Sequence, residues 1–167
     1  DFVVESGWMN GMTETEFGSR LPMTRAQFVT VLYRMEGEPA VTNTGVFKDV
    51  KDGKYYTEAV YWALQAGITT GATETTFDPE GELTRSQLVT FMYRYAGSPD
   101  TSVPPNSPFT DIAPTNRFYT EISWLASKGI STGWAGGSGT STYRPLNPVK
   151  RDAMAAFMHR FDTAFNQ

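Results

Sequence analysis

The stretch "LTRSQLVTFMYRYAG" at Leu83–Gly97 repeats a pattern found sixty residues earlier, where Met23–Gly37 reads "MTRAQFVTVLYRMEG". A degraded third copy, "VKRDAMAAFMHRF", begins at Val149. Each copy has apolar residues at positions i, i+3, i+4 and i+7, the pattern of a helix with one buried face. Packing explains a shared apolar pattern, but it does not explain why the same place in all three copies holds an arginine: Arg25, Arg85 and Arg151.

The self-similarity extends beyond these helices. The segment "FKDV", which contains Asp49, recurs 62 residues later as "FTDI", which contains Asp111. The same offset relates Trp62 to Trp124, and turn glycines form a matching series of Gly11, Gly71 and Gly133. The third copy has four additional residues in the loop "WAGGSGTSTY", which is rich in Gly and Ser and therefore tolerant of insertion. We predict three repeats, at residues 1 to about 40, 41 to about 100, and 101 to 167, and the first lacks its opening segment.

Each repeat is predicted to contain two helices. The spacing Thr-x-x-Gln at Thr24 and Thr84 is that of a capping box, and Gly37 and Gly97 are typical of helix ends. Second helices are expected at about residues 56–66 and 118–128, with a short strand or extended piece near Phe77. The fold class is therefore all-α, with three helix pairs that cover one another's apolar faces. Their packing could be linear or closed.

Composition restricts the classes of function. With 167 residues, 40% hydrophobic and 19% charged, the chain is long enough for a buried core and has the composition of a soluble globular protein. A net charge of −4 without a basic stripe argues against nucleic-acid binding, and no apolar run approaches the roughly 20 residues needed for membrane insertion. The lack of Cys excludes disulfides and thiolate metal sites, and is compatible with export. Asp1 looks like the middle of a structural element, so we expect a piece of a longer protein.

The order of these motifs resembles the S-layer homology domain. The segments that carry the resemblance are "FKDV", "YYTEAVYWALQAGITTG", "TFDPEGELTRSQ" and "YRYAGSP". The resemblance implies a pseudo-threefold assembly of three repeats with grooves between neighbours. It also implies that the grooves bind a secondary cell-wall polymer, often through a pyruvylated sugar. Such a module fixes an exported protein noncovalently to a Gram-positive-type envelope, so we expect an extracellular, cell-wall-associated location.

The resemblance also implies a set of groove residues. In the family, the Asp of the FxDV motif, the Gly of the GIxxG turn and a Trp line the groove, which here implies Asp49, Asp111, Gly11, Gly71, Gly133, Trp62 and Trp124. Arg25, Arg85 and Arg151 are the expected anion ligands, because a guanidinium can hold a carboxylate with two hydrogen bonds. Each also lies at a helix start, where unpaired N–H groups favour an anion. In the third repeat Asp152 follows Arg151 and could neutralise it, and the first repeat has no FxDV segment.

Structural roles compete with each of these assignments. The arginines could be surface residues or pair with a glutamate such as Glu82. The aspartates could cap turns, the glycines could serve only backbone conformation, and the tryptophans could belong to the core.

Two rival functions follow from the residues. One is a structural or oligomerisation module, which leaves open a self-association through the incomplete first repeat. The other is an enzyme acting on wall glycans, for which Glu58 and Glu121 are the available carboxylates. His159 does not recur in the other repeats, and "DVKDGKYY" has too few carboxylates for an EF-hand. We therefore predict a non-catalytic binding module without cofactor or metal.

Overall fold

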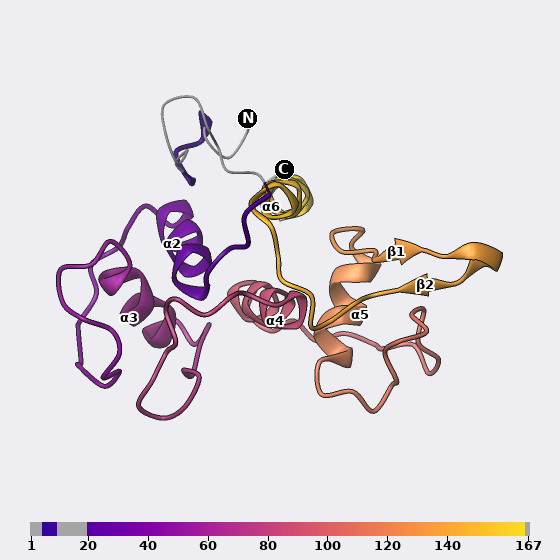
Figure 1. The fold of residues 1–167 in the computed structure, drawn as a ribbon, viewed down its shortest axis with the longest axis horizontal. Coiled ribbons are helices and arrows are strands. Elements are labelled where there is room, and N and C mark those ends of the chain that lie inside the picture. The colour runs from indigo at the N-terminus through magenta and orange to yellow at the C-terminus, as the bar shows by residue number, and fades with distance from the viewer. Residues whose placement is uncertain (1–4, 10–19, 166–167) are drawn as a thin grey trace. The chain divides into compact units, whose positions relative to one another are not determined.

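The computed structural model describes residues 5–9 and 20–165, and five α-helices form most of its regular structure (Figure 1). The helices are α2 (Arg25–Met35), α3 (Thr57–Gln65), α4 (Arg85–Tyr95), α5 (Tyr119–Ser127) and α6 (Arg151–Phe165). The predicted mainly helical fold is confirmed. The described residues also contain two short strands, β1 (Trp134–Ala135) and β2 (Ser141–Thr142), which pair antiparallel around the short 3-10 helix η1 (Gly137–Gly139). This hairpin lies in the inserted loop of the third repeat.

The start signals predicted for α2 and α4 are present. Thr24 and Thr84 each accept a hydrogen bond from the backbone N–H three residues later, and the Gln side chain at that position accepts one from the backbone N–H of the Thr. Both capping boxes are therefore complete. Past the other ends, Gly37 and Gly97 have φ of 75° and 85°, the left-handed conformation that terminates a helix.

The chain divides into two compact units. The first contains Asp1–Leu83 and Pro148–Ala155, and the second contains Thr84–Asn147 and Ala156–Gln167. Helix α2 packs on α3 in the first unit, and α4 packs on α5 in the second. In both cases the capped helix at the end of one repeat packs on the helix near the start of the next. The compact units therefore cut across the repeat boundaries predicted from the sequence.

In the first unit, three backbone segments that occupy equivalent positions in the repeats are hydrogen-bonded in a closed cycle. The N–H of Met23 donates to the carbonyl of Val149 at 2.7 Å, that of Val149 to Leu83 at 2.8 Å, and that of Leu83 to Met23 at 2.8 Å. All three side chains are buried. The segments that precede α2, α4 and α6 are thus joined to one another.

The aromatic residue of each FxDV motif packs against the loop that follows the turn glycine. Phe47 lies 5.9 Å, between ring centroids, from Phe77, and Phe109 lies 5.0 Å from Tyr143. The turn glycines leave room for these rings: a Cβ on Gly71 would be 2.7 Å from Phe47 Cε1, and one on Gly133 would be 2.8 Å from Phe109 Cε1. None of the helices within 5–9 and 20–165 is long and apolar enough to cross a membrane.

Replacement of Gly133 by Ala should destabilise the protein by more than about 1 kcal/mol, because its φ of 70° disfavours any side chain and the added methyl overlaps Phe109 and the carbonyl of Thr142. Urea denaturation followed by circular dichroism measures the change. Gly137→Ala is the matched control in the same loop, since a Cβ there meets nothing within 4 Å. Equal stability of the two variants would contradict this account.

Candidate functional site

The arginines of α2 and α4 are buried and connect consecutive repeats. Arg25 and Arg85 are each 6% exposed, at the first residue of their helices. The Nε of Arg25 donates to the carbonyl of Phe77, and the Nε of Arg85 donates to the carbonyl of Tyr143, both at 2.9 Å. Phe77 and Tyr143 occupy equivalent places in the second and third repeats. Each guanidinium therefore holds a loop of the following repeat against its own helix.

Carbonyl groups of the same loops accept hydrogen bonds from the backbone N–H groups at the helix starts. In the first unit, the N–H groups of Arg25 and Ala26 donate to Gly81 and Pro79 at 2.9 and 3.0 Å. In the second, those of Arg85 and Ser86 donate to Asn147 and Pro145, both at 3.0 Å. The expectation that free N–H groups at these positions attract an anion is wrong for α2 and α4, because the protein satisfies them itself.

The two arginines differ in their charged neighbours. Burial lowers the pKa of Arg25, and Asp78 and Asp49 act in the opposite direction. Burial also lowers the pKa of Arg85, where Tyr143 and Asp111 oppose the effect but the nearby Arg144 adds to it. The environment of Arg85 is thus the more positively charged of the two.

Aromatic rings surround the Arg85 guanidinium. Its central carbon lies 4.4 Å from the ring centroid of Trp134, 4.5 Å from that of Tyr143 and 5.4 Å from that of Phe157. Its Nη2 donates to Ser131 Oγ at 3.2 Å. Within the described ranges no carboxylate forms an ion pair with Arg85. For Arg85, neither alternative, a surface arginine or one paired with a glutamate of the described ranges, is found.

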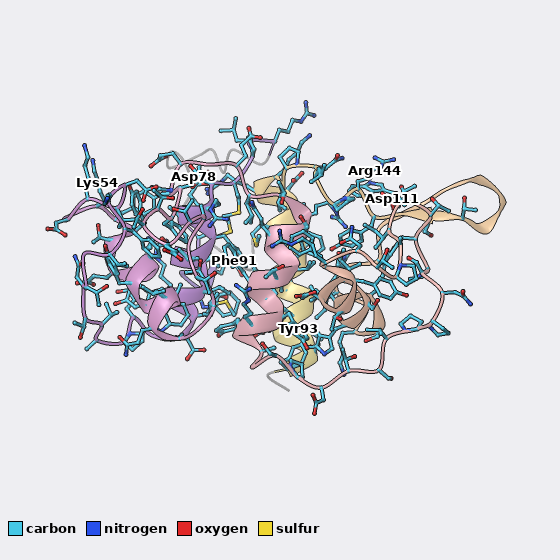
Figure 2. The ribbon with its side chains drawn as sticks, turned by 90° about the horizontal axis from the view of Figure 1, so that it is seen from below. Lys54, Asp78, Phe91, Tyr93, Asp111 and Arg144 are labelled. Carbon is cyan, nitrogen blue, oxygen red and sulfur yellow. The ribbon has the colours of Figure 1, made fainter. Side chains whose placement is uncertain are left out.

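The motif aspartates bind backbone. Asp49 accepts hydrogen bonds from the N–H groups of Phe77 and Asp78 at 2.9 and 2.7 Å. Asp111 accepts from those of Tyr143 and Arg144, both at 2.7 Å, and Figure 2 shows Asp111 and Arg144 close together. Both oxygens of each carboxylate are thus used to fix the loop that the buried arginine contacts, which favours the structural alternative for the two aspartates.

The remaining predicted residues lie in different surroundings. Trp62 and Trp124 are 8% and 3% exposed and pack on Tyr33 and Tyr93 with centroid distances of 5.6 and 5.5 Å, which favours the core alternative. Gly71 and Gly133 permit the close packing described above. Gly11 lies outside the described residues.

Arg151 is the third arginine of the series. It is 8% exposed at the start of α6, and its N–H donates to the carbonyl of Leu21 at 3.1 Å. Burial lowers its pKa, and Tyr55 acts in the opposite direction. The carboxylate of Asp152 accepts a hydrogen bond from the backbone N–H of Ala153. The loop of the first repeat that corresponds to Phe77 lies outside the described residues.

Two residues at the surface next to Arg85 were missed by the sequence analysis. Trp134 is 39% exposed, and the guanidinium carbon of Arg144 lies 4.5 Å from its ring centroid. Arg144 is exposed as well. The available signal was the third repeat's departure from the second: Trp134 stands where the second repeat has Ala72, and Arg144 where it has Asp78.

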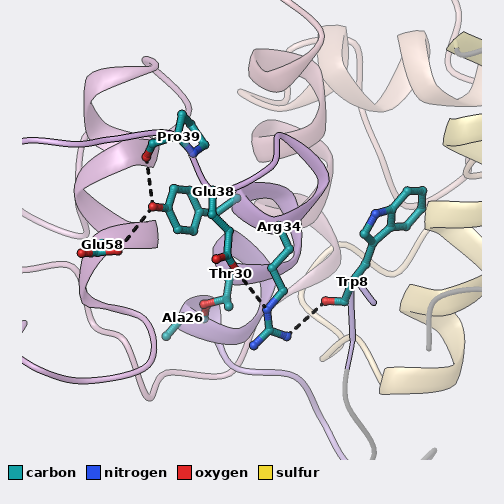
Figure 3. Close-up of polar contacts among 8 residues, drawn as sticks. Trp8, Ala26, Thr30, Arg34, Glu38, Pro39 and Glu58 are labelled. Atoms are coloured by element: carbon teal, nitrogen blue, oxygen red, sulfur yellow. Dashed lines mark hydrogen bonds and ion pairs between the residues drawn. The ribbon is translucent and has the colours of Figure 1, made fainter. Parts of the chain in front are cut away.

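The first unit contains a separate cleft of about 380 Å³ beside the C-terminal half of α2. There the Tyr33 hydroxyl contacts the Pro39 carbonyl at 3.0 Å and Glu58 at 3.4 Å, and Arg34 lies 3.9 Å from Glu38 (Figure 3). The charged residues that line the cleft are of both signs: Arg34, Glu38, Asp52, Lys54 and Glu58. This mixture gives no preference for an anion.

The described residues contain no group of three or more His, Cys, Asp or Glu that could hold a metal ion. Glu58 contacts Tyr33 in the first unit. Glu121 lies near Tyr93 in the second, where burial and, to a lesser extent, Glu121 raise the pKa of that tyrosine. The two carboxylates considered for hydrolysis thus occupy equivalent places beside repeated tyrosines.

The chain is similar to one protein family and to several bacterial surface proteins. The model of the S-layer homology domain matches residues 46–89 and 108–155, more than half of the chain. A cell surface protein from Thermoanaerobacter kivui is 33% identical over 100 residues, covering 57% of this chain and 13% of that protein. The surface-layer 125 kDa protein of Lysinibacillus sphaericus is 26% identical over 167 residues, covering 95% of this chain and 13% of its own length.

An amylopullulanase from Thermoanaerobacterium thermosulfurigenes is 31% identical over 86 residues, which are 52% of this chain and 5% of that protein. The chain therefore corresponds to a small part of each of these relatives.

Replacement of Asp111 by Ala should destabilise the protein by about 1 to 3 kcal/mol, because the backbone N–H groups of Tyr143 and Arg144 lose their acceptor. Asp111→Asn keeps one acceptor oxygen and should therefore lose less stability than Asp111→Ala. Chemical denaturation measures both, with Asp100→Ala as the control for an exposed aspartate in the same unit. If Asp111→Ala loses no more stability than the control, the carboxylate does not fix the loop.

Proposed function

Because the chain belongs to the S-layer homology domain family, we propose that it is a non-catalytic module that binds an anionic secondary cell-wall polymer. S-layer homology domains anchor surface proteins to the cell wall, and the chain has a cell-wall-associated location at the surface. The proposal adds the chemistry of the ligand, a polymer that presents a carboxylate such as that of a pyruvylated sugar.

The observation that carries the proposal is the group formed by Arg85, Trp134 and Arg144. Two guanidinium groups approach one indole ring, at 4.4 and 4.5 Å from its centroid, and Trp134 and Arg144 are exposed. A guanidinium presents hydrogen-bond donors in a planar fork that fits a carboxylate. Trp134 is 39% exposed, so the part of its indole that the two guanidinium groups leave uncovered can contact the apolar C–H groups of a sugar ring. Together they suit a sugar that carries negative charge.

We also propose that the three repeats close around a pseudo-threefold axis. The cycle of hydrogen bonds among Met23, Leu83 and Val149 supports this arrangement, because each repeat contributes the same position and bonds to both others. Such a closed core would place a binding site where each helix-start arginine meets the loop of the next repeat.

The module itself performs no catalysis under this proposal. The relatives named as enzymes, such as the amylopullulanase, match this chain over a small fraction of their length, which leaves most of each enzyme for its catalytic domains. Anchoring and catalysis would then reside in different parts of one longer chain.

Retention on purified cell walls tests the proposal. Intact sacculi should retain the protein, and sacculi stripped of their secondary polymer by acid should not. Arg85→Ala should reduce retention by more than about tenfold, because the loop that presents Arg144 loses its hydrogen bonds to the Arg85 guanidinium, each worth about 1.5 to 3 kcal/mol. Arg117→Ala removes the same charge from an exposed site in the same unit and should retain wild-type binding.

The melting temperature of each variant is measured alongside, so that loss of binding is not confused with unfolding. Equal retention of wild-type protein by intact and stripped sacculi would overturn the proposal.

A further inference from the structure

We propose that the two equivalent sites formed by the described residues are chemically unlike, and that only one of these two takes a carboxylate-bearing sugar. The acidic-sugar site consists of Arg85, Trp134 and Arg144 in the second unit. The compensated site consists of Arg25, Phe77 and Asp78 in the first. This inference rests on the proposed function and assigns the polymer's charged group to one place.

The backbone at the two sites is the same. Asp78 and Arg144 have φ of 59° and 58°, in the left-handed region that non-glycine residues rarely adopt. Each donates its N–H to the second oxygen of the motif aspartate at 2.7 Å, and each follows the residue whose carbonyl binds the buried arginine. The side chains of Asp78 and Arg144 therefore leave the backbone at equivalent positions, so the sites differ there by two units of charge.

Carboxylates already offset the charge of the compensated site. Asp78 and Asp49 act on Arg25 as negative neighbours. The position that corresponds to Trp134 holds Ala72, which offers no aromatic ring for stacking. An incoming carboxylate would meet the charge of Asp78 beside Arg25, and like charges at close range disfavour binding.

Positive charge predominates at the acidic-sugar site. The guanidinium carbons of Arg85 and Arg144 both lie within 4.5 Å of the Trp134 ring centroid, so they are no more than about 9 Å apart. Within the part of the chain that the structure describes, neither arginine has a carboxylate as an ion-pair partner. Asp111 is nearby, but its two oxygens accept backbone N–H groups. An anion that binds Arg144 while its sugar ring contacts Trp134 would relieve the repulsion between the two cations.

The roles of the two arginines are therefore different. Arg85 is 6% exposed, and its side chain fixes the loop through hydrogen bonds to the Tyr143 carbonyl and the Ser131 hydroxyl. Arg144 is exposed and carries the donor fork that a ligand in solvent can reach. Arg85 is a positioning residue, and Arg144 is the residue proposed to touch the ligand.

Isothermal titration of the 167-residue chain with a hexose that carries a pyruvyl ketal, and with the same sugar lacking pyruvate, tests the inference. We expect one bound pyruvylated sugar per chain and at least about tenfold weaker binding of the neutral sugar. Arg144→Asp should weaken binding of the pyruvylated sugar by at least about tenfold. Arg117→Asp, the same change at another exposed arginine, should leave it within about twofold of wild type.

Two further measurements keep the test decisive. Arg144→Gln removes the charge without reversing it, and this variant should also bind the pyruvylated sugar more weakly. It replaces Arg144→Asp as the test if that variant fails to fold. In nitrogen-edited NMR spectra, the indole N–H of Trp134, assigned through Trp134→Leu, should shift on titration, while the buried indoles of Trp62 and Trp124 should not.

The outcomes separate this inference from the anchoring proposal. Two equal sites per chain, or unchanged affinity in both Arg144 variants, would overturn the charge asymmetry; if intact sacculi still retain the protein, anchoring stands. Failure of intact sacculi to retain the wild-type protein would instead remove the anchoring proposal, and this inference with it.

Discussion

A buried guanidinium that binds a backbone carbonyl of the next repeat is the interaction on which the rest of the structure depends. Burying a charge is costly, and the loop carbonyls and aromatic rings around Arg25 and Arg85 help to offset that cost. The same loops supply carbonyl groups to the helix starts, and the motif aspartates fix those loops from the other side. Arginine, aspartate and loop therefore form one connected polar network between repeats.

This network explains why the residues that recur most regularly are not the most exposed ones. The repeated arginines, aspartates, glycines and tryptophans build the same framework in both units, and a framework of this kind presents a fixed loop to solvent. What the loop carries can then vary. The second repeat places Ala72 and Asp78 on it, whereas the third places Trp134 and Arg144 there, on a longer loop with a hairpin. Ligand preference is thus proposed to reside in the residues that differ between repeats.

The repeated pattern predicted most of the fold. The capping boxes, the helix ends at Gly37 and Gly97 and the second helices follow from local signals that depend on neighbouring residues alone. The burial of Arg25 and Arg85 could not be predicted in this way, because their partners Phe77 and Tyr143 are 52 and 58 residues away. For the same reason the aspartates were expected in a groove, although each binds a loop 28 to 33 residues later. Trp134 was not predicted because it occurs in the third repeat alone, whereas the predicted site residues were those that recur between repeats.

A crystal structure of the chain with a pyruvylated fragment of the wall polymer tests the central claim most directly. The account predicts that the carboxylate lies within hydrogen-bond distance of the Arg144 guanidinium and that the sugar ring contacts Trp134. The hydrogen bond from Arg85 to the Tyr143 carbonyl should remain intact. A fragment bound elsewhere on the protein, with Trp134 and Arg144 making no contact to it, would contradict the account.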